Sequence, residues 1–76
     1  MKDLIEYIAK ALVDSPDDVK VYEEEDRGRV IVRLEVKDDD YGKVIGKGGR
    51  IAQSMRALLK VTAIRRDEYA SLEIGD

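Results

Sequence analysis

Three glycines interrupt the middle of this chain, in the segment Val44-Ile45-Gly46-Lys47-Gly48-Gly49-Arg50. Glycine costs about 1 kcal/mol relative to alanine inside a helix, so this segment is predicted to be a loop between two helices. Glycine in such a loop provides either a positive backbone φ angle or room for another molecule to approach closely. Lys47 and Arg50 add positive charge, and the N-terminus of a following helix suits a phosphate. The segment therefore predicts a phosphate-binding loop.

Two familiar phosphate-binding motifs do not fit this segment. A P-loop needs a longer spacing than the one between Gly42 and Gly46, and a hydroxyl residue after its lysine, whereas a glycine follows Lys47. The dinucleotide-binding motif needs a third glycine where Ile51 stands. What remains is the motif G-x-x-G at Gly46–Gly49, between two predicted helices. The alternative is a plain glycine-rich turn with basic residues exposed by chance.

Positive charge is concentrated around this loop, although the chain as a whole is acidic. The 76 residues include 14 basic and 17 acidic ones, for a formal net charge of −3. Residues 41–66 contain seven basic and no acidic residues, whereas residues 1–40 contain seven basic and thirteen acidic ones. A local positive field can attract a polyanion while the rest of the surface stays acidic. The distribution favours a polyanionic ligand, with an ordinary solvated basic helix as the alternative.

The composition argues against an enzyme and against a membrane protein. The chain has no histidine and no cysteine, so the commonest general base and thiolate ligands are missing. We expect no catalytic residue, no cofactor and no metal; the alternative is a metal site at Asp38-Asp39-Asp40, which an enzymatic function would require. No signal peptide and no long apolar run is present, so we expect a cytoplasmic protein that does not enter a membrane.

The hydrophobic pattern predicts one domain, residues 1–76, that contains both helices and strands. Leu4, Ile8 and Leu12 recur at helical spacing and indicate a core-facing stripe, and alternating apolar residues mark the strands. One aspartate of Asp38–Asp40 is expected to cap the helix that follows. In chain order, we predict a helix at 3–13, strands at 19–25 and 29–37, a short helix at 40–45, a long helix at 50–66 with an apolar stripe at Ile51, Met55, Leu58, Leu59 and Thr62, and a strand at 69–74.

This order of elements, with G-x-x-G between the second and third helices, resembles a type II KH domain, an α+β fold whose helices pack on one face of a three-stranded sheet. The chain is similar to the small stand-alone KH proteins of bacteria, the KhpA (YlqC-like) family, over Leu4–Val19, the charged hairpin and Gly42–Ala52. Ala52 departs from the general KH pattern, which has an aliphatic residue three positions after the last glycine. The resemblance implies a cytoplasmic RNA chaperone that forms a dimer, pairs with a larger KH-containing Jag-like protein and acts in cell elongation and division.

We expect single-stranded RNA to lie across the loop, with about four nucleotides clamped. The bases would lie in an aliphatic groove whose strand wall is residues 29–36. Phe and Trp are absent and the tyrosines do not cluster in sequence, so no aromatic stacking platform is expected. The alternative is a protein-interaction or dimerisation module built on the same scaffold. The predicted RNA-binding residues are Lys43, Val44, Ile45, Gly46, Lys47, Gly48, Gly49, Arg50, Ile51 and Arg56.

Overall fold

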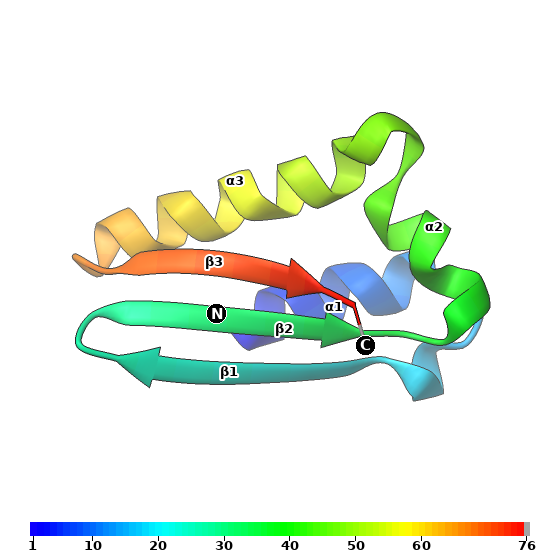
Figure 1. The fold of residues 1–76 in the computed structure, drawn as a ribbon, viewed down its shortest axis with the longest axis horizontal. Helices are drawn as coiled ribbons and strands as arrows, with labels where there is room; N and C mark the ends of the chain where they lie inside the picture. Colours follow the sequence, from blue (N-terminus) through cyan, green and yellow to red (C-terminus); the bar gives the residue numbers. More distant parts are fainter. Residues whose placement is uncertain (76) are drawn as a thin grey trace.

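The computed structural model describes residues 1–75, which form three helices and three strands (Figure 1). Their order is the predicted one, and every predicted end lies within two residues of the observed end, so the α+β fold class is confirmed. Short 3₁₀ turns at Pro16–Asp18, Asp38–Asp40 and Lys47–Gly49 connect some of them. The elements are α1 Lys2–Leu12, β1 Lys20–Asp26, β2 Arg29–Glu35, α2 Tyr41–Ile45, α3 Arg50–Arg65 and β3 Tyr69–Ile74.

The sheet combines an antiparallel hairpin with a parallel third strand. β1 and β2 form the hairpin, and β3 pairs with the other edge of β2. Arg27 and Gly28 make the hairpin turn with φ angles of 53° and 81°, as the twist of a two-residue hairpin requires. A parallel neighbour needs a long crossover, which α2, the glycine loop and α3 provide. β2 is therefore the central strand, and β3 is an edge strand.

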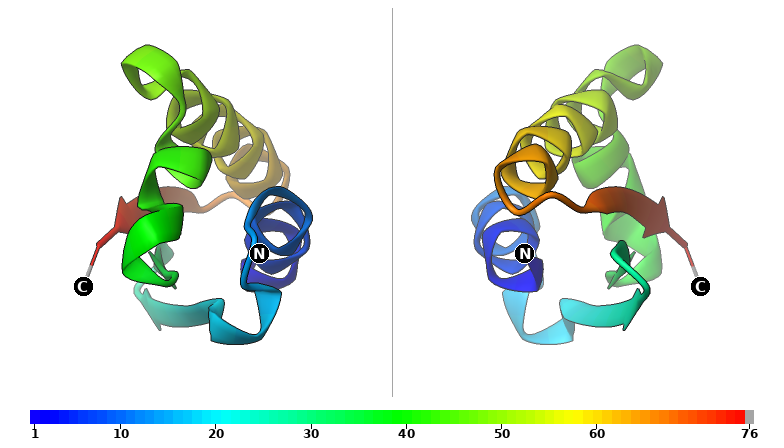
Figure 2. Two further views of the ribbon diagram at one scale, coloured as in Figure 1. Left: turned by 90° about the vertical axis from the view of Figure 1, so that its right-hand side faces the viewer. Right: turned by 90° about the vertical axis from the view of Figure 1, so that its left-hand side faces the viewer.

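The helices cover one face of the sheet and leave the other face open to solvent. α1 packs on β1 and α3 packs on β3, and the two helices lie side by side (Figure 2). Residues of β2 accordingly alternate between buried and exposed along the strand. No helix among residues 1–75 has both the length and the apolar character needed to cross a bilayer. The buried core consists of Ile5, Ala9, Val13, Val19, Val30, Val32, Leu34, Val36, Val44, Met55, Leu59 and Leu72.

The buried faces of α1 and α3 differ from those predicted by their large apolar residues. In α1 the buried line passes through Ala9, and Leu12 is exposed. In α3 it passes through Ala52 and Ala63, and Leu58 is exposed. The distance between packed elements depends on the side chains at the contact, so alanine there lets a helix approach the sheet closely. In α3 the predicted stripe is confirmed at Met55 and Leu59, which are buried, and is wrong at Leu58. In α1 the predicted stripe is turned away from the buried line and is wrong at Leu12.

One carboxylate ties the chain after α1 to the start of α2. Asp40 is only 2% exposed, and its two oxygens accept hydrogen bonds from the backbone N–H groups of Asp14 and Ser15 at 3.3 and 3.1 Å. Lys43 Nζ lies 3.5 Å from one of these oxygens. Burial acts to raise the pKa of Asp40, but the three donors outweigh it and hold that pKa below its ordinary value. Asp40 is the N-cap residue of α2, so the prediction that one of these aspartates caps the helix is confirmed in position, but its side chain bonds to Asp14 and Ser15 and makes no capping hydrogen bond.

We expect Asp40→Ala to lower the melting temperature by about 5–15 °C, because two backbone N–H groups lose their acceptor. Thermal denaturation followed by circular dichroism at neutral pH measures this change. Asp39→Ala is the matched control, since Asp39 is exposed and its carboxylate makes no hydrogen bond within residues 1–75.

The effect of this substitution should also depend on pH. The pKa of Asp40 is lowered in the folded protein, so its stabilising effect is present above the pKa of the unfolded chain and is lost as the pH falls through the folded value. The difference in stability between the native chain and Asp40→Ala should therefore narrow below about pH 4. A difference that stays constant into that range would contradict a charged Asp40.

Candidate functional site

All three loop glycines adopt backbone conformations that other residues rarely occupy. Gly46, Gly48 and Gly49 have φ angles of 78°, 64° and 77°. Gly46 closes α2 by donating its N–H to the Gly42 carbonyl at 2.9 Å, and Gly49 directly precedes α3. Left-handed backbone costs a residue with a side chain about 1–2 kcal/mol, so the sequence needs glycine at each position.

Packing against α3 restricts Gly46 further. A Cβ atom at this position would lie 2.7 Å from Cγ1 of Ile51, well inside van der Waals contact. A Cβ atom at Gly48 or Gly49 would meet nothing within 4 Å. The loop is therefore packed at its base and open at its tip, where the bare backbone is accessible to a ligand.

The tip of the loop combines backbone donors with positive charge. Gly49 donates its N–H to the Gly46 carbonyl at 3.0 Å. The N–H groups of Lys47 and Gly48 precede that bond, so they have no acceptor within the turn. Lys47 and Arg50 are exposed and form no ion pair within residues 1–75. Free N–H groups beside two unpaired cations make a surface suited to an anion.

The residues just before the loop do not all reach the surface. Val44 is completely buried, so its predicted place in a groove wall is wrong. Ile45 is 39% exposed and remains accessible beside the loop. Lys43 Nζ lies 2.7 Å from Asp14 and 3.5 Å from Asp40, and its hydrogen bond to Asp14 raises the pKa of Lys43. Lys43 is therefore charged, but two carboxylates already balance that charge.

A groove of about 490 Å³ separates the far half of α3 from β3. Arg56 and Lys60, which are four positions apart on α3, line one side. Arg56 also reaches across the groove, since its Nη2 donates a hydrogen bond to the Leu72 carbonyl at 3.3 Å. Ile64 and Leu72 contribute apolar lining. The groove therefore offers both positive charge and apolar contact.

The strand wall of this groove is β3, and none of residues 29–36, the predicted strand wall, lines it. β2 is the central strand, and its side chains Val30, Val32 and Leu34 lie in the core. The handedness of crossover connections could have placed β3 beside α3, because the strand after the two helices returns next to β2. Of the predicted site residues only Arg56 lines the groove, and sequence reasoning missed Lys60, Ile64 and Tyr69.

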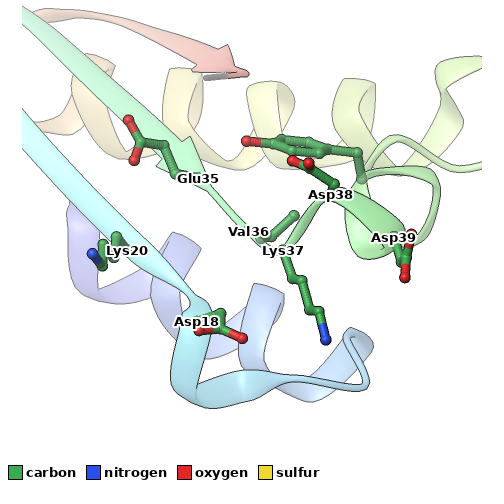
Figure 3. Close-up of a pocket in the computed structure, with 8 residues that line it drawn as sticks. Asp18, Lys20, Glu35, Val36, Lys37, Asp38 and Asp39 are labelled. Atoms are coloured by element: carbon green, nitrogen blue, oxygen red, sulfur yellow. The ribbon is translucent and has the colours of Figure 1, made fainter.

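A second hollow, of about 630 Å³, lies at the base of α2 (Figure 3). Four carboxylates and two ammonium groups line it, so it repels a polyanion. Within residues 1–75 no group of three or more potential ligands is placed to hold a metal ion. The charged residues of this hollow are Asp18, Lys20, Glu35, Lys37, Asp38 and Asp39.

A G-x-x-G loop between two helices, an antiparallel hairpin and a parallel third strand together define a type II KH domain. The family model described as "KhpA/KhpB, KH domain" matches residues 2–74. The chain belongs to this family.

Similar proteins match over nearly their whole length. The RNA-binding protein KhpA of Clostridium perfringens is 47% identical over 74 residues, which are 97% of this chain and 99% of that protein. The protein of the same name from Halalkalibacterium halodurans is 46% identical over 76 residues, which are 100% of both chains. The one from Bacillus subtilis is 40% identical over 100% of this chain and 94% of its own. No solved structure gives a significant match.

We expect Gly46→Ala to destabilise the protein by about 2–5 kcal/mol, since it adds a steric overlap to the cost of a left-handed backbone. Gly48→Ala should cost only about 1–2 kcal/mol, because its Cβ has open space. Urea denaturation measures both free energies of unfolding.

The control for this comparison is a double-mutant cycle with Ile51→Ala, which removes Cγ1 and Cδ1, two of the three Ile51 atoms that a Cβ at Gly46 would meet. The two substitutions should together cost less than the sum of their separate effects. Equal losses for Gly46→Ala and Gly48→Ala would contradict the packing of the loop base against α3.

Proposed function

We propose that this protein binds single-stranded RNA through the G-x-x-G loop and the groove between α3 and β3. The observation that carries the proposal is the tip of the loop, where bare left-handed glycines lie beside Lys47 and Arg50. A KH loop of this kind clamps the backbone of about four nucleotides. The similar proteins named above are each called "RNA-binding protein KhpA", which supports the same ligand.

The phosphates lie at the loop tip in this mechanism. The N–H groups of Lys47 and Gly48 donate to phosphate oxygens, and the N-terminus of α3 adds its positive dipole. Lys47 and Arg50 add charge that no carboxylate within residues 1–75 balances. Lys43 holds α2 in place rather than serving as a free cation. With about three phosphates neutralised, the logarithm of the affinity should fall with the logarithm of salt at a slope of about −2.

The bases lie along α3 towards β3. Ile45 and Ile51 provide apolar surface near the loop, and Arg56 extends the positive track into the groove. Arg56 donates one N–H to the Leu72 carbonyl, and the other N–H groups of its guanidinium are available as donors to base edges. Few polar groups read the bases, so sequence preference should be broad. Weak and broadly selective binding suits an RNA chaperone of the bacterial cytoplasm that acts within a complex.

We expect the double variant Lys47→Asp, Gly48→Asp to lose RNA binding by at least about tenfold, because it removes one phosphate contact and places two negative charges in the clamp. Fluorescence anisotropy with a short labelled single-stranded RNA measures the affinity. The variant should still fold, since a side chain at Gly48 has open space and aspartate tolerates a left-handed backbone better than most residues. Circular dichroism checks that it does.

A control variant with the same change in net charge distinguishes repulsion of RNA at the loop from repulsion by the protein as a whole. Lys10→Asp, Ala11→Asp changes the net charge by the same amount on the exposed surface of α1, and it should retain RNA binding. Lys43→Gln should leave the salt slope of binding unchanged, whereas Lys47→Gln should make it shallower by about 0.7. Equal binding by the loop variant and the native chain would rule out the clamp.

A second candidate function is protein association through α3. Leu58 and Val61 are 46% and 53% exposed on this helix, and both lie outside the groove. Exposed apolar residues that adjoin on one surface often mark an interface with another protein. We infer that this stripe supports a homodimer or pairing with a larger KH-containing Jag-like protein.

We expect Val61→Glu to abolish self-association, because a carboxylate would be buried at the interface without a partner. Sedimentation velocity should show a concentration-dependent dimer for the native chain and a monomer for the variant. Lys20→Glu, on the open side of β1, is the control and should remain dimeric. A native chain that stays monomeric at high concentration would exclude the homodimer.

A further inference from the structure

Tyr69 has unusually little contact with the rest of the protein for an aromatic residue in a strand. It is 80% exposed at the start of β3, although its backbone N–H is fixed by a hydrogen bond to the Gly28 carbonyl at 2.8 Å. Tyr69 pairs with Arg29 in the strand register and lies on the open face of the sheet, where no helix covers its ring. A rigid backbone therefore presents an accessible aromatic ring.

Two separate hollows meet at this residue. The groove between α3 and β3 is lined by Tyr69, Ala70 and Ser71 at its far end. A smaller hollow of about 270 Å³ on the open face of the sheet is lined by the same three residues together with Arg29 and Ile31. Tyr69 thus lies on the boundary between the two hollows, at the edge strand β3. We call this boundary the rim. An RNA that left the groove at this end would pass the Tyr69 ring.

Positive charge follows the same route. α3 has 16 residues and is about 24 Å long, and Arg56 and Lys60 lie along it between the loop and Tyr69. Arg29 continues the track beyond the ring, and it forms no ion pair within residues 1–75. Against these three cations the two hollows contain one carboxylate, that of Glu68. Asp26 pairs with Arg29 in the hairpin register and Glu25 lies beside Glu68, so the lining of the two hollows is cationic but the surface around it is mixed in charge.

We propose that a base of an RNA longer than the loop can clamp stacks on the ring of Tyr69, while Arg29 contacts the adjoining phosphate. Aromatic rings bind bases of any identity in this way, because every base has a π face. The stacking site rests on the proposed function and extends it, since it makes the length of the RNA a determinant of affinity. It departs from the expectation that no aromatic stacking platform is present, because it relies on a single exposed ring.

The test compares oligoadenylates of about four and about eight nucleotides on the full chain. Tyr69→Ala should weaken binding of the longer RNA by about 5- to 150-fold and leave the shorter one unaffected, whereas Tyr69→Phe should bind both as the native chain does. Tyr7→Ala is the matched control, because Tyr7 is 76% exposed on α1 and lines neither hollow. Circular dichroism checks the fold of each variant.

A fluorescent reporter gives a second measurement. The chain has no tryptophan, so Tyr69→Trp introduces a single one at the rim. The longer RNA should quench its emission and the shorter one should not, while a tryptophan placed by Tyr7→Trp should respond to neither. Equal affinity of Tyr69→Ala and the native chain for the longer RNA, or no quenching, would overturn the stacking site.

The amide shifts of the loop glycines in NMR spectra keep this proposal distinct from the proposed function. Shifts of Gly46, Gly48 and Gly49 with the short RNA report the clamp itself. If they are absent, the clamp fails; if they occur and Tyr69 variants have no effect, only the stacking site fails. A change of oligomeric state in Tyr69→Ala, without a change in RNA affinity, would assign the ring to a protein contact and overturn the proposal.

Discussion

Asp40 accepts hydrogen bonds from the turn after α1, while its own backbone leads directly into α2. α2 has only five residues, and a helix of that length does not persist without tertiary contacts. Its direction therefore depends on this carboxylate and on the complete burial of Val44. Since α2 ends at Gly46, the position of the glycine loop on the molecule follows from the same contacts. A buried carboxylate is tolerated because its donors replace water.

The base of the glycine loop is packed against α3, whereas its tip is open. Gly46 is fixed by its contact with Ile51, whereas Gly48 and Gly49 are held left-handed without being covered. The backbone groups at the tip are therefore ordered before any ligand arrives. A preordered site loses less conformational freedom on binding, so a small number of contacts can give useful affinity. This arrangement suits a domain that has little surface to devote to its ligand.

Local patterns in the sequence predicted the elements and the glycine loop, because helical and strand periodicities and the need for glycine are properties of short segments. They predicted Met55 and Leu59 on the buried face of α3 but not Ala9 and Ala63, which give a weaker hydrophobic signal than the exposed Leu12 and Leu58. The role of Asp40 was also hidden, because its donors lie 25 and 26 positions away. Lys43 looked like a free cation for the same reason. Predicting the groove beside α3 would have required the order of the strands in the sheet, which places β3 at the edge.

The parallel pairing of β3 has a consequence for the order in which the molecule assembles. Val30 pairs with Ala70, forty positions later in the chain, whereas the β1–β2 hairpin closes over two residues. Closing a long loop costs more chain entropy than closing a short one, and local hairpins form within microseconds. The edge strand should therefore join a preformed hairpin last, and the groove beside α3 exists only once it has done so. Any ligand that bridges α3 and β3 would stabilise this late step and slow the detachment of the strand.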